Sequence, residues 1–286
     1  MTYDLRFVIP PGQTTPTGRD VTAFLGMRHG YTALSATEVG YSNTATGVYF
    51  SFYLDDTPPE DGHPEAGTDV GVAFSLNLNR PSVFAAEAAE ELVVFVDRFG
   101  LLVDDPQSGT VGVFDPAGFV DRWRASNASA RQVTGGAGAR GGTAVTVAAA
   151  ALQRVWRWNR ALPQLRSRYR QQDIFVPTIV PAVDTPTGRA RFVAVVGVGR
   201  VALPEVDLVV LPTRQWPWPR PLARPVAVDW FQLEALHLDG DHADDPVPHT
   251  IWPYRRIPRA VIDLARRHGQ PVSALRGVHV DCLTDE

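Results

Sequence analysis

Residues 70–100 read VGVAFSLNLNRPSVFAAEAAEELVVFVDRFG, and this stretch decides the fold class. Its first nine residues, VGVAFSLNL, are rich in β-branched and aromatic side chains and predict a strand. Pro81 then stands at the first position of a predicted helix, whose apolar residues recur every three or four positions up to Val96. Gly100 ends the helix, because glycine readily adopts the left-handed backbone found there. A strand followed by an amphipathic helix indicates a sheet that helices cover.

The preceding and following residues extend this pattern through the N-terminal part of the chain. Tyr3–Ile9 alternates apolar and polar residues, and Val48–Leu54 reads VYFSFYL, so both predict strands. A short helix is predicted after Asp20, a strand-like stretch follows from Tyr31 to Tyr41, and Leu101–Val103 forms a short last strand. The order β-α-β-β-β-α-β is close to the split βαβ arrangement of ferredoxin-like domains. We therefore predict a ferredoxin-like α+β module over residues 1–105.

The remaining chain predicts a linker and a second module. Residues 106–142 are polar and glycine-rich, with one short helix at 116–125, and are interpreted as a linker. The longest predicted helix runs from 143 to about 169, with a kink or break at Pro163. Strand patterns follow, among them the nearly all-apolar Val193–Val198, which is typical of a central strand covered on both faces. Residues 143–286 are thus a mixed α/β module packed with the first, and the whole fold is α+β.

Composition excludes several classes of function. The net charge is −4, so the chain lacks the basic surface expected of a general nucleic-acid binder. All 27 basic residues are arginine, which excludes mechanisms that need a lysine. Cys282 is the single cysteine, which fits a reducing cytoplasm and excludes a thiolate zinc cluster. The chain begins without a signal-peptide pattern and has no apolar run of membrane-spanning length, so no membrane association is predicted.

One acidic loop is a candidate metal site. Histidine and carboxylate side chains at close spacing are ligands that divalent cations accept. A calcium-loop pattern fails here, because Asp244 occupies the position of the required glycine and Thr250 that of the required glutamate. The alternative interpretation is a solvated acidic turn. The candidate ligands are His237, Asp239, Asp241, His242 and His249.

Two aromatic and basic segments are candidate partner-binding surfaces. Arg157 and Trp158 lie in the predicted long helix, where arginine interleaved with tryptophan could also stack on nucleic-acid bases. Trp216-Pro-Trp218-Pro-Arg220 predicts an extended, proline-ordered segment. Its tryptophans either cap the core or form a contact surface, since tryptophan and arginine are common interface anchors.

Two further patterns favour a structural interpretation. Glu87 and Glu91 are four positions apart on the helix after Pro81, which is typical of a solvated face. Gly136, Gly138 and Gly141 have dinucleotide-binding spacing, but no buried strand precedes them. They are therefore assigned to the linker.

No pattern of residues indicates catalysis. The chain has no nucleophile-elbow sequence, and nothing around Cys282 indicates a reactive thiol. This profile of a mildly acidic bacterial protein resembles that of immunity partners of bacterial toxins. It implies a soluble, cytoplasmic, non-catalytic protein-binding module of immunity or adaptor type, with a toxin or an assembly component as its partner and no cofactor. One alternative is a metal-dependent hydrolase that uses the loop 237–249, and another is a structural component of a larger assembly.

Overall fold

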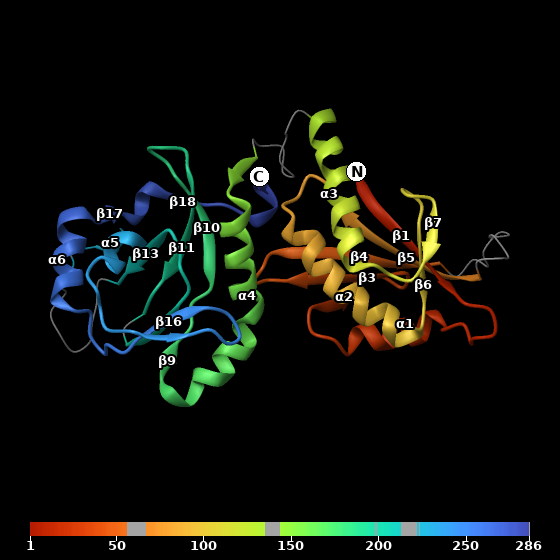
Figure 1. The fold of residues 1–286 in the computed structure, drawn as a ribbon, viewed down its shortest axis with the longest axis horizontal. Coiled ribbons are helices and arrows are strands. Elements are labelled where there is room, and N and C mark those ends of the chain that lie inside the picture. Colours follow the sequence, from red (N-terminus) through yellow and green to blue (C-terminus); the bar gives the residue numbers. More distant parts are fainter. Residues whose placement is uncertain (56–66, 135–143, 198, 213–221, 223, 286) are drawn as a thin grey trace. The chain divides into compact units, whose positions relative to one another are not determined.

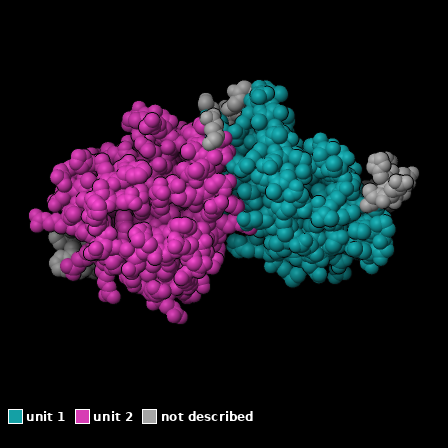
Figure 2. Space-filling model, viewed as in Figure 1, with its two compact units in different colours: residues 1–144, 281–284 teal, residues 145–280, 285–286 magenta. Residues whose placement is uncertain are grey.

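The protein is described from a computed structural model, which defines residues 1–55, 67–134, 144–197, 199–212, 222 and 224–285. The chain divides into two compact units (Figure 2). Unit 1 is Met1–Ala144 together with Asp281–Thr284, and unit 2 is Val145–Val280 with Asp285. The described chain is a mixed α+β fold with six α-helices and several sheets. None of its helices combines the length and the apolar composition that crossing a bilayer requires.

Unit 1 is built on one seven-stranded sheet, whose order is β2-β3-β4-β5-β1-β6-β7 (Figure 1). Every neighbouring pair in this sheet is antiparallel. Its strands are β1 (Thr2–Ile9), β2 (Tyr31–Ala33), β3 (Glu38–Asn43), β4 (Val48–Leu54), β5 (Thr68–Asn77), β6 (Leu102–Asp105) and β7 (Thr110–Gly112). Its helices are α1 (Gly18–Gly26), α2 (Val83–Phe99) and α3 (Pro116–Val133).

The core of unit 1 follows from the alternation in its strands. Odd-numbered residues of β1 are buried, because side chains alternate between the two faces of a sheet. Phe95 of α2 lies on that buried face, with its ring centre 4.9 Å from Phe7 of β1 and 4.9 Å from Phe52 of β4. The predicted strand–helix pair at 70–100 is therefore present as β5 and α2.

Helix α3 corrects the expectation of a linker after residue 105. The short helix expected at 116–125 continues to Val133, and β7 precedes it. Phe119 and Trp123 are fully buried, and α3 packs against α2. Asn127 of α3 also donates to the Arg80 carbonyl and accepts from the Asn79 backbone N–H. Burial and these hydrogen bonds stabilise a helix whose polar sequence is only weakly amphipathic.

The end of the chain returns to unit 1. Asp281 is buried there, and one of its carboxylate oxygens lies 3.5 Å from the Tyr49 hydroxyl of β4. The same hydroxyl accepts from the Arg80 guanidinium, at 3.1 Å from Nε and 2.8 Å from Nη2. Tyr49 and Arg80, from the first third of the chain, are thus joined to a segment that follows residues 145–280 of unit 2 in the sequence. That segment consists of the 3-10 helix η3 (Val280–Cys282) and strand β19 (Leu283–Asp285).

Unit 2 contains two larger sheets and three helices. A six-stranded sheet has the order β17-β14-β13-β11-β10-β18, and a four-stranded sheet has the order β15-β16-β12-β9 (Figure 1). The strands are β8 (Val145–Val147), β9 (Ile174–Phe175), β10 (Ile179–Asp184), β11 (Ala190–Val195), β12 (Arg200–Leu203), β13 (Leu208–Leu211), β14 (Val226–Asp229), β15 (Asp241–Ala243), β16 (His249–Trp252), β17 (Gln270–Pro271) and β18 (Leu275–Gly277). The helices are α4 (Ala149–Tyr169), α5 (Trp230–Glu234), α6 (Arg259–His268) and the 3-10 turns η1 (Arg170–Gln172) and η2 (Val272–Ala274).

Helix α4 runs through Pro163 without interruption, so of the two predicted alternatives, a kink or a break, the break is wrong. Proline removes one backbone N–H from the helix, but packing against the sheet holds the remaining turns together. Asn159 contributes to this packing, because its side chain donates to the Ile179 carbonyl at 2.8 Å and accepts from the Ile179 N–H at 3.0 Å. A buried asparagine therefore fixes α4 on β10.

Candidate functional site

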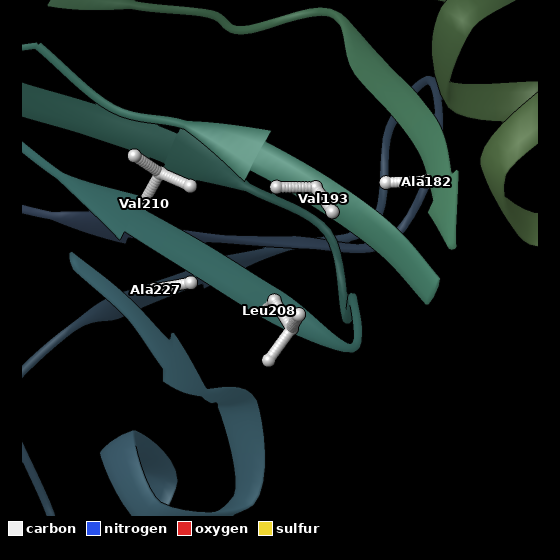
Figure 3. Close-up of a cluster of buried hydrophobic side chains, with 5 residues drawn as sticks. All are labelled: Ala182, Val193, Leu208, Val210 and Ala227. Carbon is white, nitrogen blue, oxygen red and sulfur yellow. The ribbon is translucent and has the colours of Figure 1, made fainter. Parts of the chain in front are cut away.

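The most prominent candidate site is one face of the six-stranded sheet in unit 2. Residues directly opposite one another in paired strands point to the same face. Val193 of β11 lies opposite Val180 of β10 and beside Leu208 of β13, and Val210 lies opposite Ala227 of β14. Figure 3 shows the resulting cluster, with Ala182, Val193, Leu208, Val210 and Ala227 on neighbouring strands. The nearly all-apolar sequence of β11 predicts a strand that is covered on both faces. In the structure, the face that carries Val193 is only partly covered.

A groove of about 480 Å³ is open over this face. Valines 180 and 195 line it and remain 43% and 52% exposed. Val272 and Leu275, from η2 and β18, pack over the other end of the cluster. Gly277 of β18 also lines the groove, and a Cβ atom built there would meet nothing within 4 Å.

The lining of the groove is apolar. All described residues that line it are valine, alanine, leucine, proline or glycine. Its volume is within the range of ligand and partner pockets, but such pockets normally add a few polar groups when they catalyse a reaction. Apolar contact surface is therefore what this groove offers.

The predicted partner-binding residues do not gather at one place. Trp216, Trp218 and Arg220 lie outside the described residues. Arg157 is exposed on α4, as expected for a contact residue. Trp158 is fully buried, and its indole N–H donates to the Pro177 carbonyl at 2.8 Å within unit 2. Its assignment as a partner contact is therefore corrected: the side chain belongs to the core of unit 2.

The predicted metal loop is a β-hairpin formed by β15 and β16. Its candidate ligands are spread along it, and four of them are exposed on different turns and strand positions: His237, Asp239, Asp241 and His242. His242 Nδ1 is 3.0 Å from the Thr250 hydroxyl. Within the described part of the chain, no three histidine, cysteine, aspartate or glutamate side chains are placed to hold a metal ion. The five residues thus do not form the expected ligand set.

His249 shows why the set fails. Its ring is buried, and Nδ1 lies 2.6 Å from the Val247 carbonyl. A carbonyl only accepts, so Nδ1 carries the proton and Nε2 accepts from the Tyr169 hydroxyl at 2.6 Å. Both ring nitrogens are therefore hydrogen-bonded, and the bond to Tyr169 connects the hairpin to α4.

A buried polar cluster in unit 1 was not expected from the sequence. Glu87 and Glu91 of α2 are buried rather than solvated, Glu87 completely. Glu87 accepts from the Tyr41 hydroxyl at 2.7 Å and from the Asn43 amide at 2.8 Å. Glu87 lies three positions and Glu91 seven positions after the buried Phe84, which is the spacing of the apolar face of the helix. That position within the apolar stripe is the signal that could have identified them.

The second half of this cluster is an ion pair. Arg28 lies 2.5 Å from a Glu91 carboxylate oxygen, and the Tyr31 hydroxyl donates to the same oxygen at 3.3 Å. The β2–β3 hairpin is thereby held on α2. Burial, reinforced by the Glu91 carboxylate, raises the pKa of the Tyr31 hydroxyl well above its ordinary value. Together these contacts have a structural role.

The raised pKa predicts loss of stability in alkali. Above pH 10 the unfolded chain releases the Tyr31 proton while the folded protein retains it, so stability falls as pH rises. The loss approaches about 1.4 kcal/mol per pH unit from this one group. Urea unfolding between pH 9 and pH 11.5 should show a shallower decline for Tyr31→Phe than for the wild type. Identical slopes would contradict the assignment.

Comparison with known proteins gives no relatives: no family model, curated protein or solved structure matches the chain significantly. The groove in unit 2 and the polar cluster in unit 1 are therefore the features from which a function is derived.

Proposed function

We propose that this protein is a non-catalytic, cytoplasmic protein-binding module of immunity or adaptor type, and that its partner docks in the groove of unit 2. The observation that carries the proposal is the wholly apolar, half-exposed lining of that groove among the described residues. Val180 and Val195 are side chains that a partner would remove from water, and such burial drives most protein association.

The surroundings of the groove indicate the charge of the partner. Arg224 is exposed and directly precedes the lining residue Pro225 in the sequence, whereas Arg276 alternates with Leu275 and Gly277 on β18 and belongs to the other face of the sheet. Interfaces commonly join an apolar centre to a polar rim of complementary charge. The proposed occupant is therefore a partner protein segment with aliphatic side chains flanked by acidic residues.

For unit 1 we propose a ferredoxin-like module with an added hairpin. The support is the strand order β4-β5-β1-β6 within its antiparallel sheet, with α1 and α2 in the connections that a split βαβ unit requires. Strands β2 and β3 would be the added hairpin, and β7 would be a further added edge strand. This assignment concerns architecture, and the function depends on unit 2.

The groove is tested by filling it. Gly277→Leu introduces a side chain where a Cβ meets nothing within 4 Å, so the fold should tolerate it. The partner is first isolated with tagged protein and purified, and its Kd is then measured by calorimetry. We expect Gly277→Leu to weaken binding by about tenfold or more, because it occupies the space of the partner's side chains.

Gly112→Leu is the matched control. Gly112 also lies on an edge strand, β7 of unit 1, and its Cβ would likewise meet nothing within 4 Å. The Kd of the partner for Gly112→Leu should equal its Kd for the wild-type protein. Unchanged affinity in Gly277→Leu would refute the groove as the docking site, and concentration-dependent self-association without any partner would favour a structural component instead.

A further inference from the structure

The edge of the six-stranded sheet beside the groove is open. Strand β18 is the last strand of that sheet, and β10 is its paired neighbour among the described residues (Figure 1). Leu275 and Gly277 of β18 both line the groove. Gly277 is exposed, and because glycine has no side chain, its exposed surface is backbone. The groove is thus bordered by a strand whose own backbone is accessible.

The pairing of β18 with β10 defines which backbone groups point to the open edge. The Val278 N–H donates to the Pro181 carbonyl at 3.1 Å, so these two residues form a hydrogen-bonded pair. Hydrogen-bonded and non-hydrogen-bonded pairs alternate along an antiparallel ladder. Gly277 and Leu275 are therefore in non-hydrogen-bonded pairs with β10, and their N–H and C=O groups point away from it.

One of these groups is used by the turn that precedes β18. The Leu275 N–H donates to the Val272 carbonyl at the end of η2. The Leu275 carbonyl and both backbone groups of Gly277 have no partner among the described residues. Donors and acceptors in this arrangement match the backbone of another extended segment.

Side chains on the two faces define the sequence of that segment. Residues opposite Gly277 and Leu275 would lie on the groove face, where an apolar side chain can lean over the glycine into the groove. The residue between them would lie opposite Arg276, on the other face. Arg276 is exposed and has no ion pair within the described chain, so a carboxylate opposite it is favoured. The complementary sequence is apolar, acidic, apolar.

Resting on the proposed function, we infer that the partner adds a β-strand to the open edge of β18, with alternate apolar side chains in the groove and one carboxylate beside Arg276. Backbone hydrogen bonds supply affinity, and the groove and the arginine select the sequence. The added strand runs antiparallel to β18, which is the more stable pairing per residue. A second β18 carries arginine at the central position, so another copy of the chain is not the occupant.

The test compares peptides that differ in the position of one methyl group. The parent is acetyl-TLEVT-amide, whose leucine would lie opposite Gly277 and whose glutamate would lie opposite Arg276. N-methylation of the leucine removes the N–H that donates to the Gly277 carbonyl. N-methylation of the glutamate changes an N–H on the far edge of the added strand, and this peptide is the matched control.

Dissociation constants are measured by NMR titration of the full-length protein, through its valine methyl signals. We expect the leucine-methylated peptide to bind about tenfold more weakly than the parent, and the glutamate-methylated peptide to bind like the parent. Equal affinities of the two methylated peptides would overturn the inference. So would a parent peptide that does not bind at millimolar concentration.

Gly277→Pro tests the same hydrogen bonds from the side of the protein. Proline removes the Gly277 N–H, and edge strands tolerate proline where that N–H faces solvent. We expect an unchanged melting temperature and about tenfold weaker binding of the parent peptide. Binding like that of the wild type would overturn the inference. If Gly277→Pro does not fold, the methylated peptides decide, since they use the wild-type protein.

Arg276→Gln tests the carboxylate contact separately. It should weaken the parent peptide by about two- to fivefold, as expected for an exposed ion pair, and leave acetyl-TLQVT-amide unchanged. An equal loss for both peptides, or no loss for either, would overturn the predicted acidic position.

The outcomes separate this inference from the proposed function. Loss of partner binding in Gly277→Leu with equal affinities of the two methylated peptides leaves the groove as the docking site and overturns only the added strand. Retained partner binding in Gly277→Leu overturns the docking site itself. A dimer of the peptide-free protein in sedimentation that Gly277→Pro abolishes would make a second copy the occupant and overturn the inference.

Discussion

Trp158→Ala should lower the free energy of unfolding of the protein by about 3–5 kcal/mol. The side chain is fully buried in unit 2, and its indole donates to the Pro177 carbonyl. Its ring also contacts His249, with ring centres 5.7 Å apart. Alanine would leave a cavity and an unpaired buried carbonyl, and both effects add to the loss of apolar contact. Urea unfolding followed by circular dichroism measures the change.

Arg157→Ala is the matched control for this prediction. Arg157 is the preceding residue of the same helix, but it is exposed. Its replacement should change stability by less than about 0.5 kcal/mol, as expected for a surface position. If Trp158→Ala were as mild as Arg157→Ala, the tryptophan could not be a core residue, and its assignment to a partner surface would be restored.

Glu87→Ala should have the second largest effect, a loss of about 2–4 kcal/mol, because it removes the acceptor of one buried and one half-buried donor. These donors are the Tyr41 hydroxyl and the Asn43 amide, both bonded to the same carboxylate oxygen. Glu87→Gln keeps an acceptor oxygen and should lose markedly less. Both variants are measured by urea unfolding.

Glu90→Ala tests whether the loss of stability depends on the buried position of Glu87 or follows from removing any glutamate of this helix. Glu90 lies on the same helix but is exposed. Its replacement is expected to be close to neutral. Equal losses at Glu87 and Glu90 would contradict a special role for the buried cluster.

The sequence predicts local structure better than it predicts the site. Period-two alternation identifies β1 and β4, and the apolar stripe with Gly100 identifies α2, because these signals depend on neighbours along the chain. Helix α3 was underestimated, since burial of Phe119 and Trp123 against α2 stabilises a sequence with few apolar residues. Tertiary packing outweighs propensity at such places.

The groove was beyond the reach of local patterns. Its face requires β11 to pair in parallel with β13, and β10 to pair with β18, which lies about ninety residues later. The metal loop illustrates the opposite error. Sequence spacing alone groups His249 with four exposed residues, whereas its ring nitrogens are hydrogen-bonded to the Val247 carbonyl and the Tyr169 hydroxyl. Side-chain orientation, which spacing does not encode, separates a ligand from a structural histidine.

The contribution of Asp281 to unit 1 has a consequence for biosynthesis. Tyr49 and Arg80 leave the ribosome early, but the carboxylate beside Tyr49 is made only after residues 145–280 of unit 2. At ordinary elongation rates that interval is on the order of ten seconds. During translation unit 1 must therefore persist without its last segment, whereas unit 2 is nearly contiguous and already holds Val145–Val280 at that point. A nascent chain halted before Asp281 should carry a nearly complete second unit and an incomplete first one.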